Sequence, residues 1–162
     1  MVKIERIEVR NPEEKQVIIG QGNFTIFACD DIFKALLTAA PGIKCAVAMN
    51  EAAPRLTRVT GNDERLKELA GENCLHIGAS HTFFIMLDNA YPINVLNILK
   101  SHPAVANIYV ASANPLEVIV AETELGRAVL GVVDGTAVNR IESEAEREER
   151  RKLCIELGYS VE

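Results

Sequence analysis

His81 is the side chain best suited to covalent chemistry, because three small residues, 78–80, stand directly before it. Small residues let a ligand or another backbone come close to the chain. A neutral imidazole in such a place can act as a nucleophile toward phosphorus, as a general base or as a metal ligand. A core histidine that is hydrogen-bonded to backbone is the alternative, and the residues alone leave both open.

Carboxylates stand where apolar segments end. Glu51 follows closely on the apolar run 46–49, and Asp134 follows the run 128–133. Carboxylates at the ends of strands suit a metal ion or a general base. Ordinary surface placement explains each of them equally well.

Two asparagines share one face of a predicted helix. Asn94 and Asn97 are three residues apart in the otherwise apolar segment 92–99. Because asparagine is a mediocre helix former in a helix interior, the pair indicates a hydrogen-bonding task. Recognition of a base or a ribose is one candidate, and packing against a neighbouring loop is the other.

Asn62 and Asp63 mark the start of another predicted helix. Capping of the helix accounts for them, although a helix N-terminus also attracts phosphate. Asp63 and Glu64 oppose a bare phosphate by their charge. A phosphate bridged by Mg²⁺ therefore suits this position better than direct binding.

Hydrophobic patterning predicts helices and strands that alternate along the chain. A short helix opens at 61–64 and ends near 70–71, and a long strand covers 75–87, which places His76 and His81 on opposite faces of it. The last helix begins at a capping box, Ser143 to Glu146, and is docked by leucines 153 and 157. We expect an α+β fold, with one compact domain over 1–162 and helices packed on a mixed, mostly antiparallel sheet. The other predicted strands are 2–9, 16–19, 43–49, 105–111, 118–121 and 128–133, and the other helices 31–40 and 92–100.

Composition narrows the classes of partner. The formal net charge is −6 over 162 residues, with 5% aromatic residues and no tryptophan. Nucleic-acid binders need a basic face or stacking aromatics, so we expect no nucleic-acid partner. The longest uncharged runs fall short of a membrane span. The four scattered cysteines suit reduced thiols in the cytoplasm.

If this chain binds a nucleotide, its phosphate groups must be bound by something other than a common glycine-rich loop. The sequence contains neither G-x-x-x-x-G-K-[ST] nor a G-x-G-x-x-G that opens a helix. The common glycine-rich phosphate loops are therefore excluded.

A series of short blocks, in this order, resembles the adenosine-specific kinase family over nearly the whole chain. The family is found largely in archaea and thermophilic bacteria, so a thermophile source is expected. The Pro-Ile-Asn-Val-Leu-Asn block and the Gly-Val-Val-Asp-Gly block are specific in combination. The blocks are 20–21, 51–52, 61–63, 80–83, 92–97, 111–115, 121–123, 126–127 and 131–135.

The resemblance implies a homo-oligomer that binds adenosine, AMP, ADP or ATP and carries a phosphoryl group on a histidine. His81 matches the histidine of the family's block, although Ser80 stands where the pattern has glycine. ATP or another adenine nucleotide is the implied cofactor. From the carboxylates at the ends of elements we add Mg²⁺, held by some of Glu51, Asp63 and Asp134. The implied nucleotide-binding residues are Glu51, Asn62, Asp63, Asn94, Asn97 and Asn114.

Three functions from different classes remain, the third being a structural oligomer whose polar residues are satisfied at contacts between subunits. The first is a kinase that relays phosphate through His81. The second is a non-catalytic oligomer that binds or senses adenine nucleotides. Turnover separates the first two, because a ligand that stabilises the chain without giving product favours the second.

Overall fold

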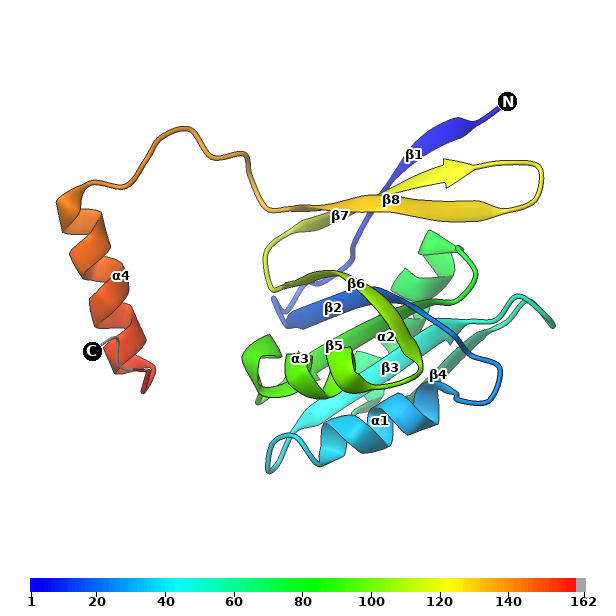
Figure 1. Cartoon of the computed structure of the whole chain (residues 1–162), viewed down its shortest axis with the longest axis horizontal. Coiled ribbons are helices and arrows are strands. Elements are labelled where there is room, and N and C mark those ends of the chain that lie inside the picture. Colours follow the sequence, from blue (N-terminus) through cyan, green and yellow to red (C-terminus); the bar gives the residue numbers. More distant parts are fainter. Residues whose placement is uncertain (160–162) are drawn as a thin grey trace.

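Eight strands and four helices make up residues 1–159, which the computed structural model describes (Figure 1). The helices are α1 (Cys29–Leu37), α2 (Glu64–Ile77), α3 (Pro92–Ser101) and α4 (Glu144–Glu156). The strands are β1 (Lys3–Glu8), β2 (Gln16–Gly22), β3 (Lys44–Asn50), β4 (Thr57–Gly61), β5 (Thr82–Asp88), β6 (Val105–Ser112), β7 (Leu116–Glu122) and β8 (Arg127–Asp134).

The strands form two sheets. A five-stranded sheet has the order β4-β3-β5-β2-β6, and a three-stranded sheet has the order β1-β7-β8. Neighbouring strands pair antiparallel in both. The α+β prediction is confirmed, but the chain builds two sheets where one was expected. The division falls at the turn 113–115, after which β7 pairs with β1 and β8.

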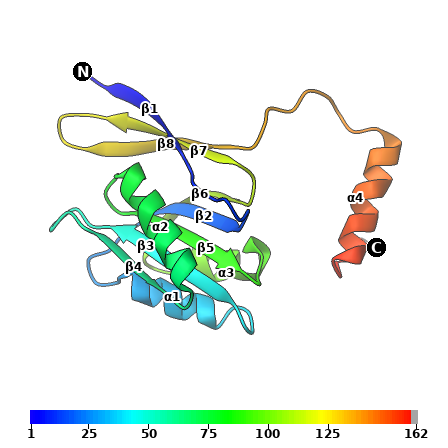
Figure 2. The same cartoon turned by 180° about the vertical axis from the view of Figure 1, so that it is seen from behind.

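The central strands β3 and β5 are buried on both faces, as the continuous apolar run at 43–49 predicts. Helices α1 and α3 cover one face of the five-stranded sheet (Figures 1 and 2). Helix α2 and the inner face of the three-stranded sheet cover the other. Side chains of β5 alternate between the two cores, with Phe83 and Ile85 toward α1 and α3, and Phe84 and Met86 toward α2.

Helix α2 is longer than predicted, and the strand expected at 75–87 begins only at Thr82. The buried residues 66, 69, 70, 73, 74 and 77 follow the helical period. Their packing outweighs the weak helix propensity of Gly71. Gly78 ends the helix in the left-handed conformation, with φ of 67°. His76 therefore lies on a helix and His81 in the loop before β5, so the expected placement on two faces of one strand is wrong.

Helix α4 stands apart from the rest of the chain at the end of the linker 135–143 (Figures 1 and 2). Its capping box is confirmed, because Ser143 Oγ accepts from the Glu146 N–H and the Glu146 carboxylate accepts from the Ser143 N–H. The docking expected of Leu153 and Leu157 is wrong, since both are 53% exposed. Within residues 1–159, no helix has the length and apolar character of a membrane span.

Candidate functional site

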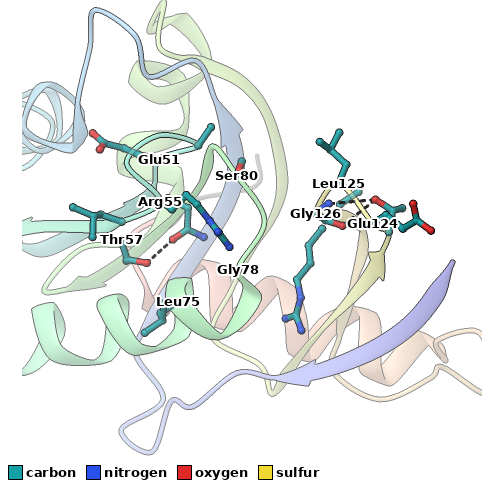
Figure 3. A pocket seen from close by; sticks show the side chains of 15 residues that line it. Glu51, Arg55, Thr57, Leu75, Gly78, Ser80, Glu124, Leu125 and Gly126 are labelled. Atoms are coloured by element: carbon teal, nitrogen blue, oxygen red, sulfur yellow. Dashed lines mark hydrogen bonds between the residues drawn. The ribbon is translucent and has the colours of Figure 1, made fainter. Parts of the chain in front are cut away.

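A cavity of about 910 Å³ opens between the two sheets' loops and the end of α2 (Figure 3). One wall is formed by the end of β3, the β3–β4 loop and the segment 78–80. The opposite wall is the tip of the β7–β8 hairpin, residues 123–128. Its size is that of a site for a small organic molecule. Figure 3 shows Glu51, Arg55 and Ser80 on the first side, and Glu124 and Leu125 on the second.

Asn50 holds the first wall together. Its amide nitrogen donates to the carbonyl oxygens of Cys74 (2.9 Å) and Ala79 (3.0 Å), and its amide oxygen accepts from the Thr57 hydroxyl (2.6 Å). The side chain is nearly fully buried, so these three bonds satisfy a polar group that would otherwise cost stability. Asn50 thereby ties the end of β3 to α2, to β4 and to the loop before His81.

Asn50→Ala is expected to lower the free energy of unfolding by about 2 kcal/mol, because it leaves buried polar partners unpaired. Urea denaturation followed by circular dichroism measures this. Asn139→Ala, in the exposed linker, is the matched control and should change stability by less than about 0.5 kcal/mol. Equal stability of the two variants would contradict the role given to Asn50.

The backbone of His81 is held from two sides. Its N–H donates to the Asn50 carbonyl (2.8 Å), and its own carbonyl accepts from the Gly22 N–H (2.7 Å). The residue has φ of 60°, in the left-handed region that few residues other than glycine adopt, although histidine enters it more often than most. The ring is half-buried and lies edge-on to Phe24, with centroids 6.2 Å apart. His81 thus adjoins the cavity through Ser80 and Asn50, while its ring is not part of the lining.

Two charged residues of the β3–β4 loop line the cavity. The Glu51 carboxylate accepts from Arg58 Nε at 3.0 Å and remains partly accessible. Arg55 is exposed in the left-handed region, with φ of 69°, and its side chain reaches toward the cavity in Figure 3. Among residues 1–159, no carboxylate forms an ion pair with Arg55. The Arg55 guanidinium is therefore available to bind an anionic group of a ligand in the cavity.

Arg127 lines the cavity but is occupied by the protein. Its guanidinium bonds to Glu122 (2.8 Å) and Glu5 (3.1 Å), and to the carbonyls of His76 (3.2 Å) and Ile77 (3.5 Å) at the end of α2. A cation at this end of a helix interacts favourably with the helix dipole.

Asn62 and Asp63 lie away from the cavity. The β3–β4 pairing places Gly61 opposite Ala46, whereas the cavity is at the other end of the hairpin, where Thr57 pairs with Asn50. The Asn62 amide bonds to the backbone of Cys45 and Ile43. Asp63 caps α2 by accepting from the Leu66 N–H at 3.0 Å. Structural capping therefore accounts for this helix start.

The remaining predicted residues also lie elsewhere. Asn94 and Asn97 are exposed on α3, beyond the opposite face of the five-stranded sheet, and Asn94 accepts from the Tyr91 N–H. Asn114 donates to Asp134 at 3.1 Å, at the end of the β7–β8 pair away from the hairpin tip. Of the predicted nucleotide-binding residues, only Glu51 lines the cavity.

The residues that sequence reasoning missed include Asn50, Arg55, Thr57, Leu75 and Leu125. The one sequence signal for them is a polar residue, Asn50, at the end of a fully apolar strand. The sequence pattern predicts a strand at Leu75, where the structure has a helix. Leu125 lies in a turn that is far along the chain from the residues on the opposite wall of the cavity. Their convergence comes from the tertiary structure.

The three buried cysteines are unsuited to nucleophilic chemistry. Burial raises the pKa of Cys29 and of Cys45 to about 11, and it raises the pKa of Cys74 further. These thiols therefore stay protonated and are poor nucleophiles. No three His, Cys, Asp or Glu side chains of residues 1–159 gather as a metal site. Mg²⁺ fits the cavity only in the manner usual for this ion, with one or two carboxylates and the phosphates of a substrate.

Known proteins resemble this chain both in sequence and in fold. The family described as adenosine specific kinase matches residues 7–160. The crystal structure of the PH1918 protein from Pyrococcus horikoshii OT3 superimposes with a TM-score of 0.95 at 61% identity, covering 100% of both chains. Among curated proteins, none matches the chain. Because the family match spans nearly all residues, the chain belongs to the adenosine-specific kinase family.

Proposed function

We propose that the chain binds adenosine or an adenine nucleotide in the cavity and transfers a phosphoryl group through His81. The observation that carries the proposal is the cavity of about 910 Å³ beside a half-buried histidine. Family membership supports adenosine as the ligand and kinase-like chemistry as the reaction. As part of this proposal, we also expect that the protein forms a homo-oligomer, is located in the cytoplasm and comes from a thermophile.

The cavity suits a flat, largely apolar base. Leu56, Leu75 and Leu125 line it and expose 47%, 63% and 100% of their surface. Exposed leucines that converge on one hollow from three different elements are typical of a ligand site. Adenine would cover these three leucines.

Phosphate groups would meet Arg55. A guanidinium forms strong, paired hydrogen bonds with phosphate oxygens. Glu51 and Glu124 are the carboxylates of the lining that would hold Mg²⁺ together with those phosphates. The ion would neutralise phosphate charge.

The chemical step is an in-line displacement at the terminal phosphorus. The lone pair of one His81 ring nitrogen forms the N–P bond as the P–O bond to the leaving nucleotide breaks. The proton on the other ring nitrogen then leaves to solvent. In a second displacement, the oxygen of an acceptor hydroxyl or water forms the new P–O bond as the N–P bond breaks. The proton that the acceptor loses balances the one that the leaving ring takes up, which restores the neutral imidazole.

Ligand-dependent melting tests the binding site. Adenosine, AMP, ADP and ATP should each raise the melting temperature, by about 5–10 °C at a hundred times the dissociation constant. Guanosine and cytidine nucleotides at the same concentrations are the controls. Failure of all four adenine ligands to move the transition would contradict the proposal.

Arg55→Ala is expected to weaken ATP about tenfold or more and adenosine less than about twofold, because only ATP presents phosphates to the guanidinium. Isothermal titration calorimetry measures both affinities. Arg151→Ala, on the exposed surface of α4, is the matched control and should leave both unchanged. An equal loss for ATP and adenosine would show that Arg55 shapes the loop and does not bind phosphate.

One observation favours the second function, a binding or sensing protein without turnover. The His81 ring faces Phe24 edge-on and lies outside the cavity lining. Phosphoryl transfer needs the ring nitrogen within reach of the phosphorus. Stabilisation by ATP with no phosphate on the chain and no product would select this function.

A further inference from the structure

The C-terminal arm, residues 136–159, exposes hydrophobic side chains that an isolated chain leaves in water. Val138 and Ile141 in the linker are 95% and 91% exposed. Leu153, Ile155 and Leu157 at the end of α4 each expose more than half of their surface. None of the residues of α4 is buried. Such a concentration of uncovered apolar surface on one segment marks a contact site.

Helix α4 also lacks the support that a helix of its length needs. Helices shorter than about 12–15 residues are marginal in water without tertiary packing. Its ion pairs, such as Arg140 with Glu146 and Arg150 with Glu142, are exposed and contribute little. An apolar surface that covers Leu153 and Leu157 would supply the missing stabilisation.

The three-stranded sheet presents such a surface. Its inner face packs Val118 and Val120 into the core with α2. Its outer face carries Ile4, Ile119 and Val133 around the ion pair of Arg6 with Glu117, and the exposed Leu130 stands at the bulge of β8 beside them. We call Ile4, Ile119, Leu130 and Val133 the outer sheet face. The β1-β7-β8 pairing places them on adjacent strands, and Ile4, Leu130 and Val133 are exposed.

The C-terminal arm and the outer sheet face belong to the same chain, but the linker holds the arm away from that face. It leaves β8 after Asp134 and carries α4 beyond the edge of the molecule, with no packing on the body (Figures 1 and 2). Nine extended residues span up to about 30 Å, which is sufficient to reach a neighbouring molecule. A second copy of the chain supplies both missing surfaces at once.

We propose that the C-terminal arm of one copy packs on the outer sheet face of a second copy, so that copies exchange arms. This rests on the homo-oligomer of the proposed function and adds the contact that builds it. Each copy then gives one arm and receives one, which covers Leu153 and Leu157 against Leu130 and its neighbours. Adenosine binding in the cavity does not depend on this contact.

Two full-length variants test the exchange by disulfide formation. Both carry Cys154→Ser; one adds Leu157→Cys and the other Leu130→Cys. They are unfolded together in guanidinium, refolded as a mixture and oxidised. A covalent pair with twice the 17.7 kDa mass of one chain, containing one copy of each variant, is the expected product. Replacing Leu130→Cys by Leu37→Cys, on the exposed surface of α1, is the control and should give no mixed pair.

Light scattering completes the test. The wild-type chain should have a mass of at least two copies, and Leu153→Glu with Leu157→Glu should shift it to a single chain, whereas Glu149→Gln should not. An assembled protein without the mixed pair overturns arm exchange and leaves the homo-oligomer standing. A single-chain mass for the wild type overturns both. A disulfide within one chain, in a variant that carries Leu130→Cys and Leu157→Cys together, also overturns exchange.

Discussion

His81→Ala is expected to abolish the uptake of phosphate from ATP that is stable in alkali and labile in acid. The N–P bond to an imidazole has this stability, and His81 is the histidine that adjoins the cavity through Ser80 and Asn50. The extent of labelling should fall about 100-fold or more, because the nucleophile itself is removed. Intact-mass measurement at alkaline pH, with and without ATP, detects the added phosphoryl group.

His76→Ala is the matched control for this experiment. His76 is exposed on α2, its backbone carbonyl accepts from Arg127, and its imidazole makes no hydrogen bond within residues 1–159. Its substitution should leave labelling unchanged. Equal labelling of wild type and His81→Ala would remove His81 from the mechanism, and absence of label on the wild type would favour the binding or sensing function.

Gly20→Ala is expected to lower the free energy of unfolding by about 3 kcal/mol, at the upper end of the cost of overpacking a core. A Cβ at this position would lie 2.3 Å from Phe83 Cζ and 2.4 Å from the Asn107 carbonyl oxygen. The Phe83 ring is fully buried and packs edge-on to Phe24, so it cannot simply rotate away. The melting temperature should fall by about 6–12 °C in a domain of this size.

Gly131→Ala provides the comparison for Gly20→Ala. Gly131 also lies in a strand, β8, but a Cβ there would meet no atom within 4 Å. Calorimetry should show an unchanged or slightly higher melting temperature, since alanine loses less chain entropy on folding than glycine. Similar melting temperatures for the two variants would disprove the close approach of β2 to Phe83.

Part of the candidate site is visible in the sequence because it depends on local chemistry. Glu51 directly follows the apolar strand β3, so its place at a strand end could be predicted from the run of small apolar residues before it. His81 was found in the same way, from the small residues before it. The conformation of His81 could not be predicted, because distant partners, Asn50 and Gly22, hold its backbone.

The other predicted residues show where local reasoning ends. Asn62 and Asp63 stand at a helix start in the sequence as in the structure, but the β3–β4 register places them at the far end of the hairpin from Glu51. Asn94 and Asn97 share a helix face as predicted, yet α3 lies on the other side of the five-stranded sheet from α2. Spacing defines a face of an element, and only packing decides which neighbour that face meets.

The α+β class, most strand and helix positions, the capping box of α4 and the family of the chain could all be predicted from the amino-acid sequence. These follow from patterns within a few residues or from a match along the whole chain. Three features could be seen only in the folded chain: α2 continues to Ile77, the leucines 56, 75 and 125 converge on one cavity, and α4 stands free of the body. The physical reason is that burial is a property of the assembled molecule: each of these outcomes depends on contacts between segments tens of residues apart, which no local pattern records.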